Sequence, residues 1–267
     1  MKQQRPGTAR AVVDGLKLHR HAVRLNGAAH TVITLRPGAE ARFSTNRFHE
    51  TWHVLSDPHG AALLARLLWG LAYQARPGTV VLIDRPFLTP TPFDADPAER
   101  ILLVPGWCTS FDNRSNRLLK KALPLRHSTG TVRWRTHGLD QALAARDSSI
   151  RPYYVPEEGT VRGGSGTVVL TPASPLEARD WAVQVARLNT ANDFGSDYVY
   201  LGPWRGRQDG EVQVFRRFRP MVGVAGRARA RVLARPDVPA GPGDLRAEVW
   251  REAAIVGDVG LPRSTGG

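Results

Sequence analysis

The residues with the clearest capacity for chemistry form the pentapeptide His49-Glu50-Thr51-Trp52-His53. It fits the pattern H-E-x-x-H, which on a helix places both imidazoles on one face, where they can share a zinc ion. The glutamate would then lie beside the metal and could deprotonate a bound water molecule. His59 follows as a third candidate ligand. In this interpretation the segment predicts a zinc-dependent hydrolase.

The spacing of these histidines, H-E-x-x-H-x5-H, resembles the extended ligand motif of the metzincin metallopeptidases over eleven residues. The resemblance implies a zinc peptidase in which His49, His53 and His59 bind the metal and Glu50 is the general base. Ser56 stands where that family has a glycine, so the match is confined to the ligands and the base.

The same segment also suits a β-strand, and this alternative leads to different chemistry. A strand would point His49 and His53 in the same direction but hold them ~13 Å apart along the backbone, too far to share one zinc ion. The backbone conformation of residues 47–60 therefore decides between a metal site and ordinary structural histidines.

Charge is distributed unevenly along the chain. The 267 residues include 37 Lys+Arg against 24 Asp+Glu, which gives a formal net charge of +13. Residues 1–47, 114–135 and 203–235 each carry a net charge of +7, and the remaining stretches are mildly acidic. Such blocks favour a polyanionic partner, either nucleic acid or an anionic membrane surface. The alternative is the solvated surface of a basic protein.

Large rings are interleaved with the basic residues in two of these blocks. Arginine side chains fork onto phosphates and aromatic faces stack on bases, so this mixture is typical of nucleic-acid-binding surfaces. Trp134, Trp204 and Phe218 are the candidate stacking platforms, although the same rings could be core anchors. The candidate nucleic-acid-binding residues are Arg114, Arg117, Lys120, Lys121, Arg133, Trp134, Arg135, Trp204, Arg205, Arg207, Arg216, Arg217, Phe218, Arg219, Arg227, Arg229 and Arg231.

Hydrophobic patterning predicts a mixed α/β fold with a partly parallel central sheet, flanking helices and a more antiparallel C-terminal part. Apolar runs at 79–83, 101–104 and 167–170 indicate buried strands. Helices are expected after the caps Ser56 and Ser174, each followed closely by proline.

The C-terminal part carries a further arginine pattern. Residues 227–233 alternate between arginine and apolar residues, which predicts a strand with three arginines on one face. Overall we expect a flexible tail over 1–9 and a single domain over 10–235. Residues 236–267 are expected to form a Pro/Gly-rich linker, a short helix at 245–254 and a tail.

Other chemistries find less support. Ser165 lies among glycines as in a nucleophile elbow, but a strand follows it and no histidine lies beyond His137, which argues against a Ser-His triad. Cys108 is the only cysteine, so no intrachain disulfide can form. If the central strands were parallel neighbours, Asp84, Trp107 and Thr171 would line one crevice at their carboxyl ends.

The leading interpretation is a cytoplasmic nucleic-acid-binding protein, with the choice between DNA and RNA left open. The N-terminus lacks the apolar segment of a secretory signal, and residues 61–72 are too short to span a bilayer. The second interpretation is the zinc hydrolase, and no other cofactor is expected. The third is an interaction protein without catalytic chemistry.

Overall fold

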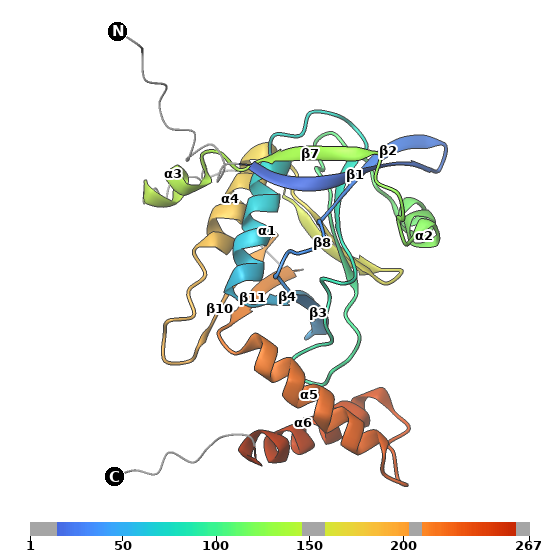
Figure 1. Ribbon diagram of the computed structural model, residues 1–267, viewed down its shortest axis with the longest axis vertical. Coiled ribbons are helices and arrows are strands. Elements are labelled where there is room, and N and C mark those ends of the chain that lie inside the picture. The colour runs from blue at the N-terminus through green and yellow to red at the C-terminus, as the bar shows by residue number, and fades with distance from the viewer. Residues whose placement is uncertain (1–14, 146–157, 203–209, 260–267) are drawn as a thin grey trace.

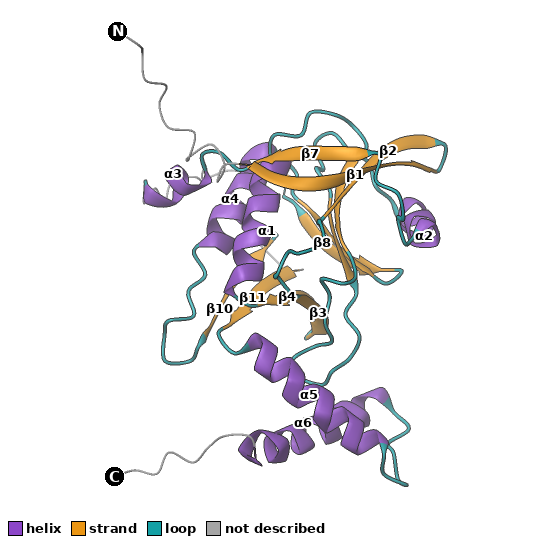
Figure 2. Cartoon of the chain, in the orientation of Figure 1, coloured by secondary structure: helices purple, strands orange, loops and turns teal. Residues whose placement is uncertain are grey.

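A computed structural model describes residues 15–145, 158–202 and 210–259 of the chain. Its strands are β1 Gly15–Leu25, β2 Ala28–Thr34, β3 Phe43–Phe48, β4 Thr51–Ser56, β5 Thr79–Ile83, β6 Arg100–Leu103, β7 Gly130–Arg135, β8 Thr160–Gly164, β9 Thr167–Thr171, β10 Ser196–Leu201 and β11 Gly210–Phe215. Its helices are α1 Pro58–Leu71, α2 Asn113–Ala122, α3 Leu139–Ala144, α4 Pro175–Ala186, α5 Phe218–Leu233 and α6 Pro242–Val259 (Figures 1 and 2).

The strands form two mixed sheets, which confirms the predicted mixed α/β class. The seven-stranded sheet has the order β7-β1-β2-β5-β6-β9-β8, and its β2–β5 and β6–β9 pairs are parallel. The four-stranded sheet has the order β10-β11-β4-β3, with β4 and β11 parallel. The remaining neighbours in both sheets are antiparallel, so each sheet is only partly parallel.

The large sheet is buried on both faces, as the alternation along β5 shows. Val81 and Ile83 join the main core, which also contains residues of α1, α4 and the small sheet. Val80 and Leu82 point to the other face, where a second cluster includes Leu119 of α2. Helices α1 and α4 therefore cover one face of this sheet and α2 covers the opposite face.

Capping residues explain where two helices begin. Ser174 accepts a hydrogen bond from the Glu177 backbone N–H at 3.1 Å, and α4 starts at the next residue, as predicted. Helix α1 also starts where predicted, but its cap is Asp57 rather than Ser56: the Asp57 carboxylate accepts from the Gly60 N–H at 2.8 Å.

Two local predictions were wrong. Residues 227–233 belong to α5 and not to a strand, so Arg227, Arg229 and Arg231 do not project from one strand face. The crevice at the strand ends does not form as expected, because β5 and β6 are antiparallel. Asp84 instead pairs with Arg100, the first residue of β6, at 2.8 Å.

Helices α5 and α6 pack against each other beside the small sheet (Figure 1). Their contact is a small apolar cluster formed by Ala228, Val232, Val249 and Val256, separate from the main core. None of the helices in the described ranges is both long and apolar enough to cross a bilayer.

Candidate nucleic-acid interface

Helix α2 divides cleanly into a buried side and a basic side. Its cap is Asp112, whose carboxylate accepts from the Ser115 N–H at 2.7 Å. Asn116 and Leu119 face the sheet. The outward positions hold four exposed basic residues, Arg114, Arg117, Lys120 and Lys121. The two lysines lie in the last turn, where positive charge complements the helix dipole.

Strands β1 and β7 present further basic side chains on the same face of the large sheet. Lys17 and Arg133 are directly opposite each other in the β1–β7 ladder, and both are exposed. Their neighbours Leu18 and Trp134 point to the main core on the other face. Between α2 and β7, the connection carries the exposed Arg126. Helix α2 and the β1–β7 edge thus contribute to one side of the molecule.

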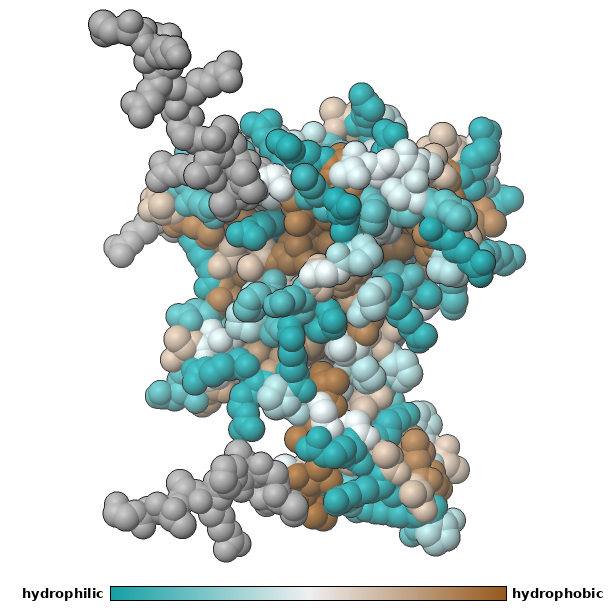
Figure 3. Space-filling model, viewed as in Figure 1, coloured by the Kyte–Doolittle hydropathy of each residue, from teal (hydrophilic) through white to brown (hydrophobic). Residues whose placement is uncertain are grey.

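We call this surface the α2 face. It comprises Lys17, Arg114, Arg117, Lys120, Lys121, Arg126 and Arg133. Within the described ranges, none of the seven has a carboxylate within ion-pair distance. Arg135 lies at its margin, with the guanidinium 4.1 Å from the centroid of the Tyr73 ring. Hydrophilic side chains cover much of the surface visible in Figure 3 over the large sheet.

Two carboxylates lie close enough to modulate this charge. Hydrogen bonds from Ser115 lower the pKa of Asp112, and the charge of Arg114 adds to the effect. Burial raises the pKa of Glu99, and the charge of Lys120 opposes that rise. The positive charges of Arg114 and Lys120 are thus partly offset by these nearby carboxylates. Neither Arg117 nor Lys121 contributes to a shifted pKa among the described residues.

The C-terminal basic block, residues 216–235, has a different environment. Arg219 pairs with Asp57 at 3.0 Å, and Arg229 pairs with Asp96 at 2.7 Å. Arg231 pairs with Glu252 of α6 at 3.2 Å. The remaining bonded arginines are Arg216, whose guanidinium donates to the Thr190 and Asn192 carbonyls, and Arg235, which pairs with Glu248 and Glu252. Arg217 and Arg227 are exposed.

The predicted stacking platforms within the described ranges are core residues instead. Trp134 is 1% exposed and donates its indole N–H to the Leu67 carbonyl at 3.0 Å. Phe218 is 0% exposed at the start of α5. Neither ring can stack on a base, so this part of the prediction was wrong. Trp204, Arg205 and Arg207 lie outside the described residues.

The H-E-x-x-H segment is a β-hairpin and not a helix. Residues His49 and Glu50 form the two-residue turn between β3 and β4, with φ values of 46° and 69°. His53 lies within β4, and His59 is exposed in the first turn of α1. Of the two alternatives, the extended one therefore holds for Thr51–Ser56, and the helix that would have aligned the imidazoles on one zinc ion does not form. Because Glu50 lies in the turn, it is not held beside a metal site as a general base would be.

His53 has its own partners on the small sheet. Its Nδ1 lies 2.8 Å from the Asn46 amide oxygen, and its Nε2 lies 3.5 Å from Glu211 Oε2. Burial lowers the pKa of His53 and raises that of Glu211. Among the described residues, no group of three or more His, Cys, Asp or Glu side chains could hold a metal ion. The histidines of this segment therefore do not form the predicted ligand set.

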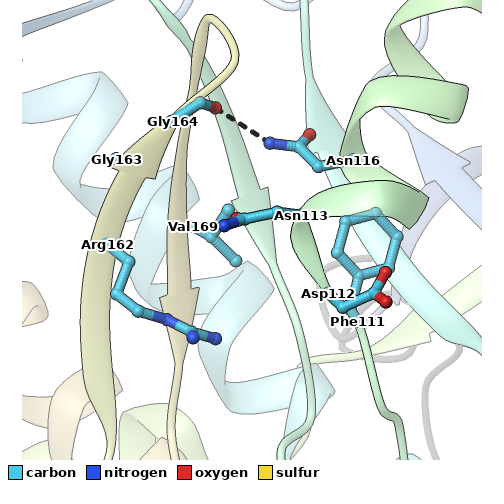
Figure 4. Close-up of a pocket in the computed structure, with 8 residues that line it drawn as sticks. All are labelled: Phe111, Asp112, Asn113, Asn116, Arg162, Gly163, Gly164 and Val169. Carbon is cyan, nitrogen blue, oxygen red and sulfur yellow. Dashed lines mark hydrogen bonds between the residues drawn. The ribbon is translucent and has the colours of Figure 1, made fainter.

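A groove lies between the start of α2 and strand β8, next to the α2 face. Figure 4 shows the Arg162 side chain extending from β8 toward it and Asn113 pointing in from α2. Phe111 and Val169 supply apolar lining. The Asn116 amide donates to the Gly164 carbonyl at 2.9 Å, which joins the two walls.

Sequence reasoning missed Asn113, Arg162 and the groove, because their proximity depends on how α2 packs on the sheet. The only available signal was Asp112 three residues before Ser115, a spacing typical of a helix cap. Comparisons with protein-family models, with curated proteins and with solved structures found no match for this chain.

Proposed function

We propose that the protein binds nucleic acid through the α2 face, by neutralising backbone phosphates. The observation that carries the proposal is the state of its charges: four basic residues line the outer side of one helix, and they lack ion pairs with the described carboxylates. When such cations neutralise phosphates, the counterions condensed on the nucleic acid are released, and this release favours binding most at low salt.

The arrangement favours backbone contact over recognition of base sequence by a helix. Leu119 packs helix α2 against the sheet, and the outer side of the helix carries long, flexible basic side chains. Buried Trp134 and Phe218 cannot supply stacking. Phosphate contacts position a protein on nucleic acid without reading its sequence. We therefore expect affinity to depend weakly on sequence and strongly on salt.

The proposal places the protein in the cytoplasm, where nucleic acid and a reducing environment occur together. The free thiol of Cys108 is compatible with that setting.

Fluorescence anisotropy with labelled DNA and RNA, single-stranded and duplex, tests the proposal across salt concentrations. The α2 variant carries Arg114→Gln, Arg117→Gln, Lys120→Gln and Lys121→Gln. We expect it to flatten the slope of log affinity against log salt by about 3 to 4 units. Two matched controls remove exposed charge from the opposite side of the large sheet, Arg66→Gln on α1 and Arg187→Gln at the end of α4.

Each outcome bears on the proposal. Binding that weakens with salt and is lost selectively in the α2 variant supports it. Absence of binding to every probe at low salt refutes it. The α2 variant removes four positive charges and each control removes one. If one control weakens binding as much as the average loss per charge in the α2 variant, the proposal is also refuted, because the effect would then come from net charge alone.

A further inference from the structure

A further cation, outside the α2 face as defined above, lies on the side of the large sheet that α2 covers. Arg162 of β8 is directly opposite Val169 in the β8–β9 ladder, and Val169 belongs to the apolar cluster beneath α2, so both side chains lie on that side. Arg162 is exposed and forms no ion pair with a carboxylate of the described residues. Because β8 is the last strand of the sheet, Arg162 marks one edge of it (Figure 4).

Arg133 marks the opposite edge of the same side. It is exposed on β7, the strand at the other end of the sheet, beside Lys17 of β1. Six strand spacings of about 4.8 Å separate β7 from β8, or about 29 Å in all. The connection from α2 to β7 also lies on this side, because Leu123 and Leu125 pack against the cluster beneath α2, and it carries the exposed Arg126. Cations are therefore present at both edges of the sheet and between them.

The surface on which these cations lie is convex. Leu119 packs α2 onto the sheet, and Arg117 and Lys121 are on the outer side of the helix. A helix with its side chains is about 10 Å across, so these outer cations stand about that far above the sheet. Arg162 and Arg133 extend from the strands themselves. Figure 1 shows α2 on the side of the sheet away from α1 and α4. A ligand that contacts both edges and α2 must therefore bend over the helix.

The two forms of nucleic acid differ in their ability to follow this surface. A short duplex is effectively straight, because DNA has a persistence length of about 150 base pairs. Laid against the outer side of α2, a duplex stands clear of at least one sheet edge. A single strand is flexible and its backbone can track a cationic path. Its phosphates are about 3.4 Å apart along a stacked strand, so the 29 Å between the edges corresponds to about nine nucleotides.

We propose that the α2 face selects single-stranded nucleic acid, which passes over α2 from Arg162 at one edge of the sheet to Arg133 at the other. The proposal rests on the proposed function, since phosphates are the groups that these cations hold. Arg162 and Arg133 contact phosphates near the two ends of a bound segment of about nine nucleotides, and α2 contacts its middle. A duplex reaches the cations of α2 alone.

The experiment measures anisotropy at low salt with labelled oligothymidines of increasing length and with a duplex of about 12 base pairs. We expect the wild-type protein to bind the oligothymidine of about 12 nucleotides at least about fivefold more tightly than the duplex, and the affinity to level off beyond about nine nucleotides. Arg162→Gln and Arg133→Gln should each weaken binding of the long single strand by about threefold, through loss of one phosphate contact. Each should change the affinity for the duplex by less than about 1.5-fold.

Two single-charge variants serve as matched controls. Arg117→Gln, on the outer side of α2, should weaken binding of single strand and duplex by the same factor. Arg66→Gln, exposed on α1 across the sheet, should affect neither. Equal or tighter binding of the duplex overturns the proposal and leaves the α2 face intact, as does an edge variant that weakens both forms equally or neither. Affinity that levels off at about four nucleotides also overturns it. No binding of either form at low salt is a failure of the proposed function itself.

Discussion

The α2 face and the C-terminal basic block have similar compositions but opposite electrostatic environments. Helix α2 packs on a sheet face of valine and leucine, and its outward cations form no ion pair with a carboxylate of the described residues. Helix α5 packs beside α6, whose Glu248 and Glu252 pair with Arg235 and Arg231. In this protein, basic residues stay without ion pairs on a helix that packs on apolar residues, and they form ion pairs where the packing partner carries carboxylates.

In the C-terminal basic block, the ion pairs of the arginines hold separate elements together. Arg229 and Arg246 both reach Asp96, so the α5–α6 pair is tied to the loop before β6 by ion pairs. Arg219 ties the start of α5 to Asp57, the residue that caps α1. Arginine there connects elements, while arginine on α2 faces solvent.

The largest expected effect is a loss of stability on removing a buried ring, either Trp134 beneath the α2 face or Phe218 in the C-terminal basic block. Replacing Trp134 or Phe218 with alanine should lower the free energy of unfolding by about 3 to 5 kcal/mol, because each is fully packed. Urea denaturation measures this loss. The folded fraction should keep its nucleic-acid affinity. A ring whose removal weakened nucleic-acid binding and left stability unchanged would instead be a stacking platform.

Charge reversal at two matched exposed arginines compares the regions directly. Arg117→Glu on α2 should weaken nucleic-acid binding by about tenfold or more, because it replaces an attraction to phosphate with a repulsion. Arg227→Glu on α5 should change the affinity by less than about twofold, since it lies outside the α2 face. Anisotropy at low salt measures both. Equal losses would mean that overall charge, and not the α2 face, governs binding.

Ion pairing predicts a difference in stability at a smaller scale. Arg229→Gln removes the pair with Asp96 and the hydrogen bond to the Asp94 carbonyl, both partly buried. It should lower the free energy of unfolding by about 1 to 2 kcal/mol, less at high salt. Arg117→Gln should cost less than about 0.5 kcal/mol. Denaturation at two salt concentrations checks both values, and a larger cost at Arg117 would reveal a structural role for it.

The smallest effect is a pH dependence of stability that has opposite signs at Asp112 of the α2 cap and at Glu211 of the small sheet. Burial raises the pKa of Glu211 on β11, so the unfolded chain releases this proton first and stability falls as pH rises above the unfolded value. Glu211→Gln should abolish that fall, a change below about 1 kcal/mol. Hydrogen bonds lower the pKa of Asp112, so its contribution is present at neutral pH and is lost on acidification.

Denaturation curves between acidic and neutral pH measure these slopes, with Asp112→Asn as the companion variant. Asparagine keeps a capping oxygen without the charge, so this variant should lose the acid-dependent part alone. If Glu211→Gln leaves the pH slope unchanged, the buried carboxyl does not titrate as its environment implies.

The sequence predicted the parts of the fold in which local signals and burial agree. The run at 79–83 became β5 without a shift, and the Ser174 cap started α4 as expected. Helix α2 gives a weak sequence signal because its buried positions are Leu119 and two small polar residues, with Leu118 partly buried beside them, and this stripe is too short to show helical periodicity. Its cap, Asp112, was the one signal present.

The alternating arginines show why local patterning can mislead. Residues 227–233 alternate as a strand would, yet Ala225, Ala228 and Val232 are the buried positions, and their spacing is helical. Ala228 and Val232 are buried because α6 packs against them, a contact that the local sequence does not encode. Likewise, the H-E-x-x-H spacing carries no information about a turn at His49, which the pairing of β3 with β4 imposes.

The position of the basic residues on β7 depends on close packing in the core beneath them, as Gly70 of α1 shows. A Cβ atom there would lie 2.1 Å from the Trp134 indole nitrogen and 2.8 Å from the Arg135 carbonyl oxygen. A single methyl group at this position, near the C-terminal end of α1, would therefore displace β7 and move Arg133 with it. Screens for loss of nucleic-acid binding should recover substitutions at this inaccessible position, and they would mark alignment of the edge strand rather than contact with the ligand.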